Sequence, residues 1–127
     1  MITVQTTYIG DLRTENTHVQ SGVRLITDAP CDNRGKGESF SPTDLVATAL
    51  GNCIMTIMGI KAMDNGIDIK GTKVEITKIM ADNPRRIGEV IVSFFFPKNS
   101  FTPDQMQLIE SVAGTSPGPL SLHPAIK

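Results

Sequence analysis

The feature that most constrains the fold of this chain is one long apolar segment with helix-start and helix-stop residues at its two ends. Ser41 suits the N-cap of a helix, Pro42 suits the first helical position, and Asp44 completes a capping box with Ser41. Gly66 is a favourable stop at the other end. The segment therefore predicts a helix of about 22 residues, roughly 33 Å long at the usual rise per residue.

Apolar side chains occupy nearly the whole circumference of this predicted helix. Its length and hydropathy raise the question of a membrane span. Polar residues interrupt the segment, however, and its caps are those of a soluble helix, so we interpret it as a core helix buried nearly all round. The interrupting residues are Thr48, Asn52, Thr56 and Lys61.

Strand patterns stand on both sides of the long helix. Residues 1–28 read as short strands punctuated by glycine, and residues 27–40 form a loop rich in turn-forming residues. Residues 72–80 alternate between polar and apolar, as a half-buried strand does. A turn around Pro84 and a second strand at 89–96 complete a predicted hairpin.

A second helix is predicted near the end of the chain. It begins at Thr102, where Gln105 completes another capping box, and it is expected to end at Gly114. The three prolines of 115–127 make regular structure there doubtful. The order of strands, long helix, hairpin and helix is an α+β layout, and a length of 127 residues suits a single domain, 1–127.

Composition narrows the classes of partner. The net charge is −1, there is no tryptophan and there is one tyrosine, which argues against nucleic acid and against an anionic membrane. The hydrophobic fraction of 39% is lean for a solitary globule and hints at an oligomer that shares its core.

The two cysteines carry no disulfide or metal signature. The chain has no CxxC motif and only two histidines, so we expect neither a metal site nor a cofactor. The first residues lack the pattern of a signal peptide, which favours free thiols in the cytoplasm.

Cys53 lies in the middle of the predicted core helix, and two interpretations are open. A free cysteine is usually a small buried hydrophobe. A reactive thiol must instead be partly ionised, and the helix dipole fades within the first turn, so a cation from elsewhere in the chain or from a partner chain would be needed. Cys31, in the loop before the helix, is either an exposed bystander or a resolving thiol.

The segment DAPCDNRGKGESFSPTDLVATALGNCIMTIMGIKA, residues 28–62, resembles the OsmC/Ohr family, in particular its short OsmC-like branch. The resemblance rests on the glycine-bearing loop followed by SPTDL and ALGNC on one helix. The ending TSPGPLSLHP resembles the family's T-C-P-x-x-x-S-L-H-P segment. The resemblance implies an OsmC-like α+β fold, with a long buried central helix packed on antiparallel sheets in an intertwined homodimer.

The resemblance also implies a chemistry, in which a helix-borne thiolate reduces an organic hydroperoxide or peroxide. Cys53 is then the peroxidatic thiol, and Arg13 matches the family's activating arginine. The family's second cysteine falls at Ser116, so the usual resolving thiol is missing. The family's carboxylate ten residues before the thiol falls at Thr43, and Asp44 or Glu38 would have to substitute.

Three functions follow as expectations. The first is a thiol-dependent hydroperoxide reductase that is impaired or uses a single cysteine, with a thiol reductant as partner. The second is a non-catalytic protein that binds a small apolar ligand near Cys53, and the third is a thiol redox sensor. Side chains considered as pocket lining, or alternatively as core, are Phe40, Phe94, Phe96 and Met58.

Overall fold

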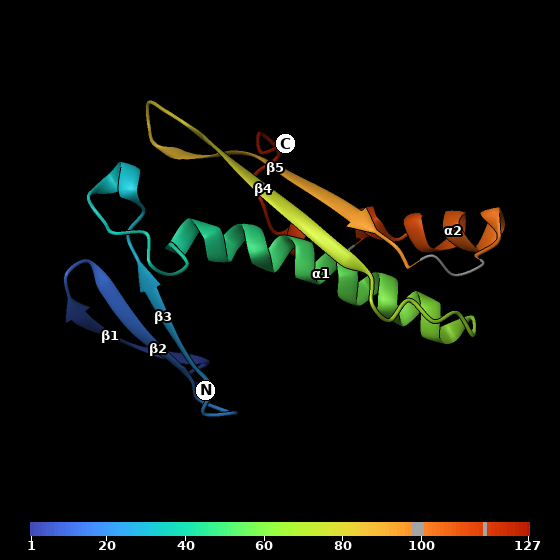
Figure 1. The fold of residues 1–127 in the computed structure, drawn as a ribbon, viewed down its shortest axis with the longest axis horizontal. Helices are drawn as coiled ribbons and strands as arrows, with labels where there is room; N and C mark the ends of the chain where they lie inside the picture. Colours follow the sequence, from blue (N-terminus) through green and yellow to red (C-terminus); the bar gives the residue numbers. More distant parts are fainter. Residues whose placement is uncertain (98–100, 116) are drawn as a thin grey trace. The chain divides into compact units, whose positions relative to one another are not determined.

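Three antiparallel strands, in the order β1-β2-β3, form the first part of the chain in the computed structural model (Figure 1). They are β1 (Val4–Gly10), β2 (Arg13–His18) and β3 (Arg24–Asp28), so the strands predicted in 1–28 are confirmed. The structure describes residues 1–97, 101–115 and 117–127. These residues form two units, Met1–Val46 and Ala47–Lys127, and each is described below by itself.

The turn between β1 and β2 places Arg13 at the start of β2. Gly10 pairs with Arg13, so Asp11 and Leu12 form a two-residue loop. Both loop residues have positive φ, 55° and 62°, as hairpin turns of this length require. Leucine is strained in that conformation, and hydrogen bonds from the Leu12 N–H to the Tyr8 hydroxyl and from the Ala29 N–H to the Leu12 carbonyl hold it there.

The first unit buries no apolar side chain. Its buried residues are Thr27, Asp28 and Ser41. Large apolar side chains are exposed instead, among them Tyr8 at 64% and Val23 at 65%. A three-stranded sheet usually needs one hydrophobic face covered to be stable. We therefore expect the exposed apolar side chains of this unit to pack against another surface.

The long helix α1 spans Pro42–Asp64 and confirms the predicted start and stop. The Asp44 N–H donates to Ser41 Oγ at 3.1 Å, and the Ser41 N–H donates to the Asp44 carboxylate at 3.0 Å. At the other end, the N–H groups of Gly66 and Ile67 donate to the carbonyls of Met63 and Ala62. This pairing, with φ of 67° at Gly66, is a Schellman motif.

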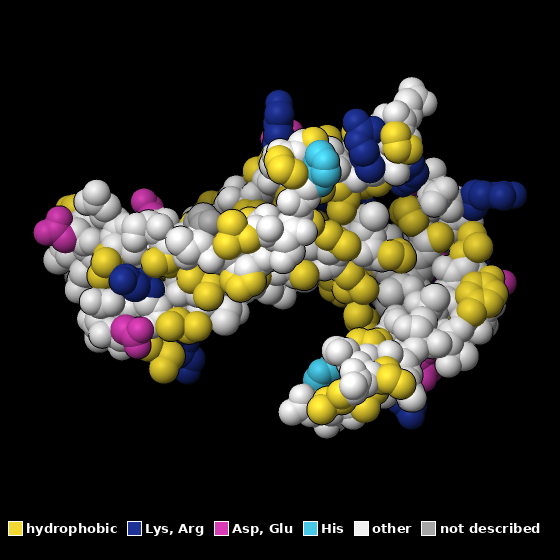
Figure 2. Space-filling view, turned by 180° about the vertical axis from the view of Figure 1, so that it is seen from behind, with side chains coloured by type: hydrophobic (Ala, Val, Ile, Leu, Met, Phe, Trp, Pro, Cys, Tyr) yellow, Lys and Arg dark blue, Asp and Glu magenta, His cyan; other side chains and the backbone are white. Residues whose placement is uncertain are grey.

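In the single chain, only one side of α1 is buried. Among its residues, Ala47, Leu50, Gly51, Met58 and Ala62 are buried. Ile60 and Met63 are 51% and 80% exposed, and hydrophobic side chains show at the surface of the molecule in Figure 2. By length and composition alone α1 could also cross a membrane, a test that the core helices of soluble proteins pass as well.

The predicted hairpin is present in the second unit as β4 (Lys73–Ala81) and β5 (Arg86–Phe95). It runs along α1 (Figure 1), and Gly51 is the point of close approach. A Cβ at Gly51 would lie 2.3 Å from Cδ1 of Ile76. The core beside it comprises Met58, Ala62, Ile67 and Ile109, with partly buried side chains that include Phe94 and Phe96.

The second predicted helix is α2 (Pro103–Glu110), and its capping box is confirmed. The predicted end at Gly114 is wrong, because the helix stops at Glu110 and a 3-10 turn, Ala113–Thr115, follows. The Ser111 hydroxyl donates to the Leu108 carbonyl, one of the groups that a longer helix would pair with a backbone N–H.

The proline-rich tail is more regular than its sequence indicates. A short helix, α3, spans Pro117–Leu120, where prolines are tolerated because first-turn N–H groups have no helical partner. Lys127 then pairs with β5, since its N–H donates to the Gly88 carbonyl and its carbonyl accepts from the Val90 N–H. The last residue of the tail is thereby hydrogen-bonded to the edge of β5.

Candidate functional site

Cys53 lies half-buried near the middle of α1, in the second unit. Its sulfur faces α3, and the Gly118 N–H donates a hydrogen bond to Cys53 Sγ with a nitrogen–sulfur distance of 3.3 Å. The two residues are 65 positions apart in the chain. Neither Gly118 nor this contact was anticipated from the sequence, because a lone glycine between prolines gives no local signal of what it touches.

Local hydrogen bonds stabilise the short helix α3. The Ser121 hydroxyl and N–H both donate to the Pro117 carbonyl, at 2.7 and 3.0 Å, and the Leu122 N–H donates to the Pro119 carbonyl. Ser116, the position of the family's second cysteine, lies outside the described residues.

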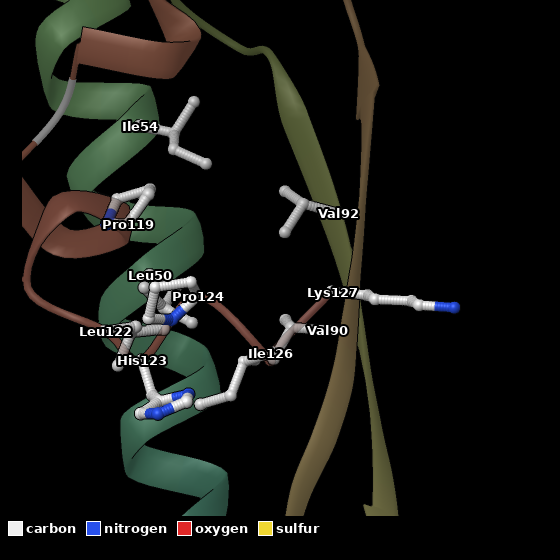
Figure 3. A pocket seen from close by; sticks show the side chains of 10 residues that line it. All are labelled: Leu50, Ile54, Val90, Val92, Pro119, Leu122, His123, Pro124, Ile126 and Lys127. Carbon is white, nitrogen blue, oxygen red and sulfur yellow. The ribbon is translucent and has the colours of Figure 1, made fainter.

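An apolar pocket of about 190 Å³ opens beside this part of α1 (Figure 3). Leu50 and Ile54, which flank Cys53 on the helix, line one wall, and Val90 and Val92 of β5 line another. In Figure 3 the Lys127 side chain points away from the pocket. The remaining lining residues are Pro119, Leu122, His123, Pro124 and Ile126.

His123 supplies a polar group at the edge of this pocket. The Ala125 N–H donates to His123 Nδ1 at 3.1 Å, so in the neutral ring the hydrogen is assigned to Nε2. The imidazole is thus a polar group with one N–H donor among lining residues that are mostly apolar.

The side chains considered from the sequence as pocket lining do not line this pocket. Met58 belongs to the buried core, and Phe94 and Phe96 pack against it. Phe40 lies in the first unit and is 46% exposed.

Arg13 lies in the first unit, in a cluster of ion pairs with two carboxylates. Its Nη2 is 3.3 Å from Asp28 Oδ2 and 3.0 Å from Glu38 Oε2. The pairing of β2 with β3 sets Arg13 directly opposite Asp28. The structure thus brings together Arg13 and Glu38, which the sequence analysis named separately. Asp28 was missed from the sequence, because only the strand register reveals that contact.

Asp28 is the buried centre of this cluster, with an exposed fraction of 0%. The N–H of Glu38 donates to Asp28 Oδ2 at 3.0 Å, and this bond, with the charge of Arg13, holds the pKa of the Asp28 carboxyl below its ordinary value. The hydrogen bond with Glu38 is the main cause that raises the pKa of Arg13. Asp28 Oδ1 and Arg13 Nε are buried without a hydrogen-bond partner in the described part of the chain.

The loop between β3 and α1 presents Glu38 to this cluster. Gly35 lies against the backbone of Ala29, where a Cβ would be 1.8 Å from the carbonyl oxygen. Gly37 has φ of 65° and packs against Cys31, whose thiol is exposed and donates to the Lys36 carbonyl at 3.4 Å.

Asp44 and Thr43 stand at the start of α1. The Asp44 carboxylate accepts from the Ser41 N–H, which completes the helix cap, and the hydroxyls of Thr43 and Ser41 are within hydrogen-bond distance. Of the two carboxylates considered from the sequence, Glu38 forms an ion pair with Arg13. Asp44 instead caps α1. Cys53 belongs to the second unit.

The chain matches both a family model and solved structures of known proteins. The family model described as OsmC-like protein matches residues 35–127. A crystal structure from Psychrobacter arcticus 273-4 is 50% identical, with a TM-score of 0.94, and the match covers 99% of this chain and 91% of the other. The chain belongs to the OsmC-like protein family. The Psychrobacter protein is named for osmotic stress induction and detoxification response.

More distant structures share the fold of this OsmC-like protein. An organic hydroperoxide resistance protein OsmC from Legionella pneumophila has a TM-score of 0.75 at 12% identity, covering 100% of this chain and 93% of that one. An organic hydroperoxide resistance protein from Elizabethkingia anophelis has a TM-score of 0.68 at 18% identity, with 100% and 92% covered. No curated protein matches the chain by sequence.

Proposed function

We propose that this OsmC-like protein reduces organic hydroperoxides with Cys53, in the cytoplasm and as a homodimer. The observation that carries the proposal is a half-buried thiol that accepts a backbone hydrogen bond and whose helix neighbours Leu50 and Ile54 line an apolar pocket. Family membership and the names of the Legionella and Elizabethkingia proteins support it.

The first chemical step transfers one oxygen atom to sulfur. The Cys53 thiolate attacks the distal peroxide oxygen, a sulfur–oxygen bond forms and the oxygen–oxygen bond breaks. Sulfur is oxidised to sulfenic acid, and the hydroperoxide leaves as an alcohol after taking a proton from water. A thiol reductant then condenses with the sulfenic acid and releases water, and a second thiol regenerates Cys53.

Arg13 is the proposed source of positive charge for this step. Its guanidinium is always charged and presents a planar set of donors that suits an anion or a peroxide oxygen. Asp28 and Glu38 hold its Nη2, while its Nε has no partner among the described residues. Glu38 rather than Asp44 is the proposed carboxylate, because Asp44 caps α1.

Mass spectrometry of the intact chain after one equivalent of cumene hydroperoxide tests the proposal. We expect one added oxygen on Cys53, recovery of the original mass with a thiol reductant, and catalytic consumption of the hydroperoxide. Cys53→Ser should abolish all three, and the matched Cys31→Ser variant should keep them. A wild-type chain whose Cys53 stays reduced would overturn the proposal.

The pocket favours a second candidate function, the binding of a small apolar ligand without turnover. A cavity of about 150 Å³ lined by apolar side chains is large enough for benzene, and this pocket is of similar size at about 190 Å³. Binding of cumyl alcohol that is lost in Val92→Phe but kept in Ile91→Phe, with no oxidation of Cys53, would favour this function. Ile91 is the matched control because it is a neighbour on β5 that does not line the pocket.

A further inference from the structure

The contact between α3 and Cys53 is made by the backbone of Gly118, a residue without a side chain. We propose that the Gly118 N–H is the hydrogen-bond donor that activates the Cys53 thiolate, and that the absence of a side chain at position 118 lets this donor come close to the sulfur. The inference rests on the proposed function, in which Cys53 is the attacking thiol. It adds an activating group within the second unit, separate from the charge of Arg13.

The geometry of α3 leaves this N–H free for the sulfur. Gly118 is the second residue of α3, and the first N–H groups of a helix have no carbonyl partner inside it. Pro117 and Pro119 have no N–H at all, so Gly118 carries the one backbone donor of these three residues. It donates to Cys53 Sγ at 3.3 Å.

A hydrogen bond of this kind favours the charged form of the thiol. A donor that binds an anion stabilises it more than the neutral acid, because the interaction is charge-assisted. The N-terminus of α1 cannot supply this effect, since Cys53 lies several turns beyond Pro42 and the helix dipole acts within the first turn. The Gly118 N–H thus acts directly on the reacting atom.

The packing leaves little room for a side chain at position 118. A Cβ there would lie 3.2 Å from the Cβ of Cys53, 3.5 Å from its Sγ and 3.4 Å from Cδ2 of Leu50. The first distance is tighter than ordinary contact, so α3 or α1 would have to shift by a few tenths of an ångström. The φ of Gly118 is not in the left-handed region, so alanine changes this spacing without imposing backbone strain.

Alkylation by iodoacetamide across pH tests the role without relying on peroxidase activity. Gly118→Ala should lower the alkylation rate of Cys53 near neutral pH by roughly tenfold, the scale of a charge-assisted hydrogen bond that is largely lost. Leu120→Ala is the matched control, because it alters an exposed side chain of the same short helix. Its profile should coincide with that of the wild type.

A second variant separates the donor from the packing. Replacement of Gly118 by glycolic acid, through nonsense suppression, turns the amide into an ester and removes the N–H with little change in shape. The ester should shift the alkylation profile in the same direction as Gly118→Ala. An unchanged profile in the ester variant would overturn the inference, whatever Gly118→Ala does.

The two proposals fail in different measurements. If the wild type consumes no cumene hydroperoxide but the ester shifts the alkylation profile, the proposed function is wrong and Gly118 still activates the thiol. If hydroperoxide is consumed and the ester leaves both the profile and the rate unchanged, the proposed function stands and the inference on Gly118 is wrong.

Discussion

At the scale of a single residue, the buried carboxyl of Asp28 should make the stability of the first unit depend on pH. Because its folded pKa is lowered, the stability that it contributes is present above the pKa of the unfolded carboxyl, about 3.9, and is lost as the pH falls through the lower folded value. We therefore expect stability to drop in acid below about pH 4.

Asp28→Asn tests this assignment by urea unfolding between pH 2.5 and 7. The variant should be less stable than the wild type at pH 7, and the difference should shrink in acid. Glu15→Gln is the control, since Glu15 forms only a long surface ion pair of 3.9 Å with Arg24. A constant difference between Asp28→Asn and the wild type across this range would show that Asp28 is not the titrating group.

We propose that the serine at position 116 affects how an oxidised Cys53 is resolved. With no family thiol at this position, the Cys53 sulfenic acid should be driven to sulfinic acid by excess hydroperoxide. Ser116→Cys should instead give a disulfide between Cys53 and the introduced thiol, and reduce the over-oxidised fraction several-fold. Peptide mapping without reductant distinguishes these products.

Cys31 provides the competing outcome of the same mapping. It is exposed and lies in the loop before α1, so it is available to react. A dominant Cys31–Cys53 disulfide in the unmodified chain would show that the loop supplies the resolving thiol, and the single-cysteine interpretation would then be wrong.

At the scale of elements, Gly51 determines how closely the hairpin packs on α1. A Cβ there would lie 2.3 Å from Ile76 Cδ1 and 2.8 Å from its Cγ1, so Gly51→Ala forces this side chain to move. Overpacking of a core typically costs about 1–3 kcal/mol. Alanine also gains up to about 1 kcal/mol in helix propensity, so we expect a net loss of up to about 2 kcal/mol in the free energy of unfolding measured with urea.

Gly59→Ala is the matched control on the same helix. A Cβ at Gly59 meets nothing within 4 Å, so alanine should be neutral or should stabilise by up to about 1 kcal/mol through helix propensity. Equal effects of the two variants would show that the close approach at Gly51 is not a constraint on packing.

At the scale of the whole molecule, the main feature of the single chain is the number of large apolar side chains exposed at its surface. The first unit buries no apolar residue, and α1 exposes Ile60 and Met63. A second copy of the chain is the cover that we propose, consistent with the lean composition. Sedimentation equilibrium should therefore give twice the chain mass of 13.7 kDa at micromolar concentration.

Ile60→Glu probes this assembly, because a charge on an apolar interface is costly to bury. We expect dissociation or loss of folded protein, while Thr77→Glu, on the exposed polar face of β4, should stay dimeric. A wild-type chain that sediments as a stable, folded monomer would rule the dimer out.

Local sequence determined the ends of α1, the start of α2 and the β4–β5 hairpin. Capping residues, a C-terminal glycine and alternating polarity act over a few positions, so their effect can be read from neighbours in the chain. The same local reasoning failed for the tail, because Pro117 and Pro119 sit where a helix does not need their N–H groups.

Tertiary structure alone decided the surroundings of the candidate site. Arg13 meets Asp28 through strand register, and Gly118 meets Cys53 across 65 positions of the chain. The pocket beside Cys53 likewise combines side chains of α1, β5 and the tail. Such contacts depend on how elements pack, which residue type and spacing do not specify, whereas the thiol itself and its place on a capped helix were determined by the sequence.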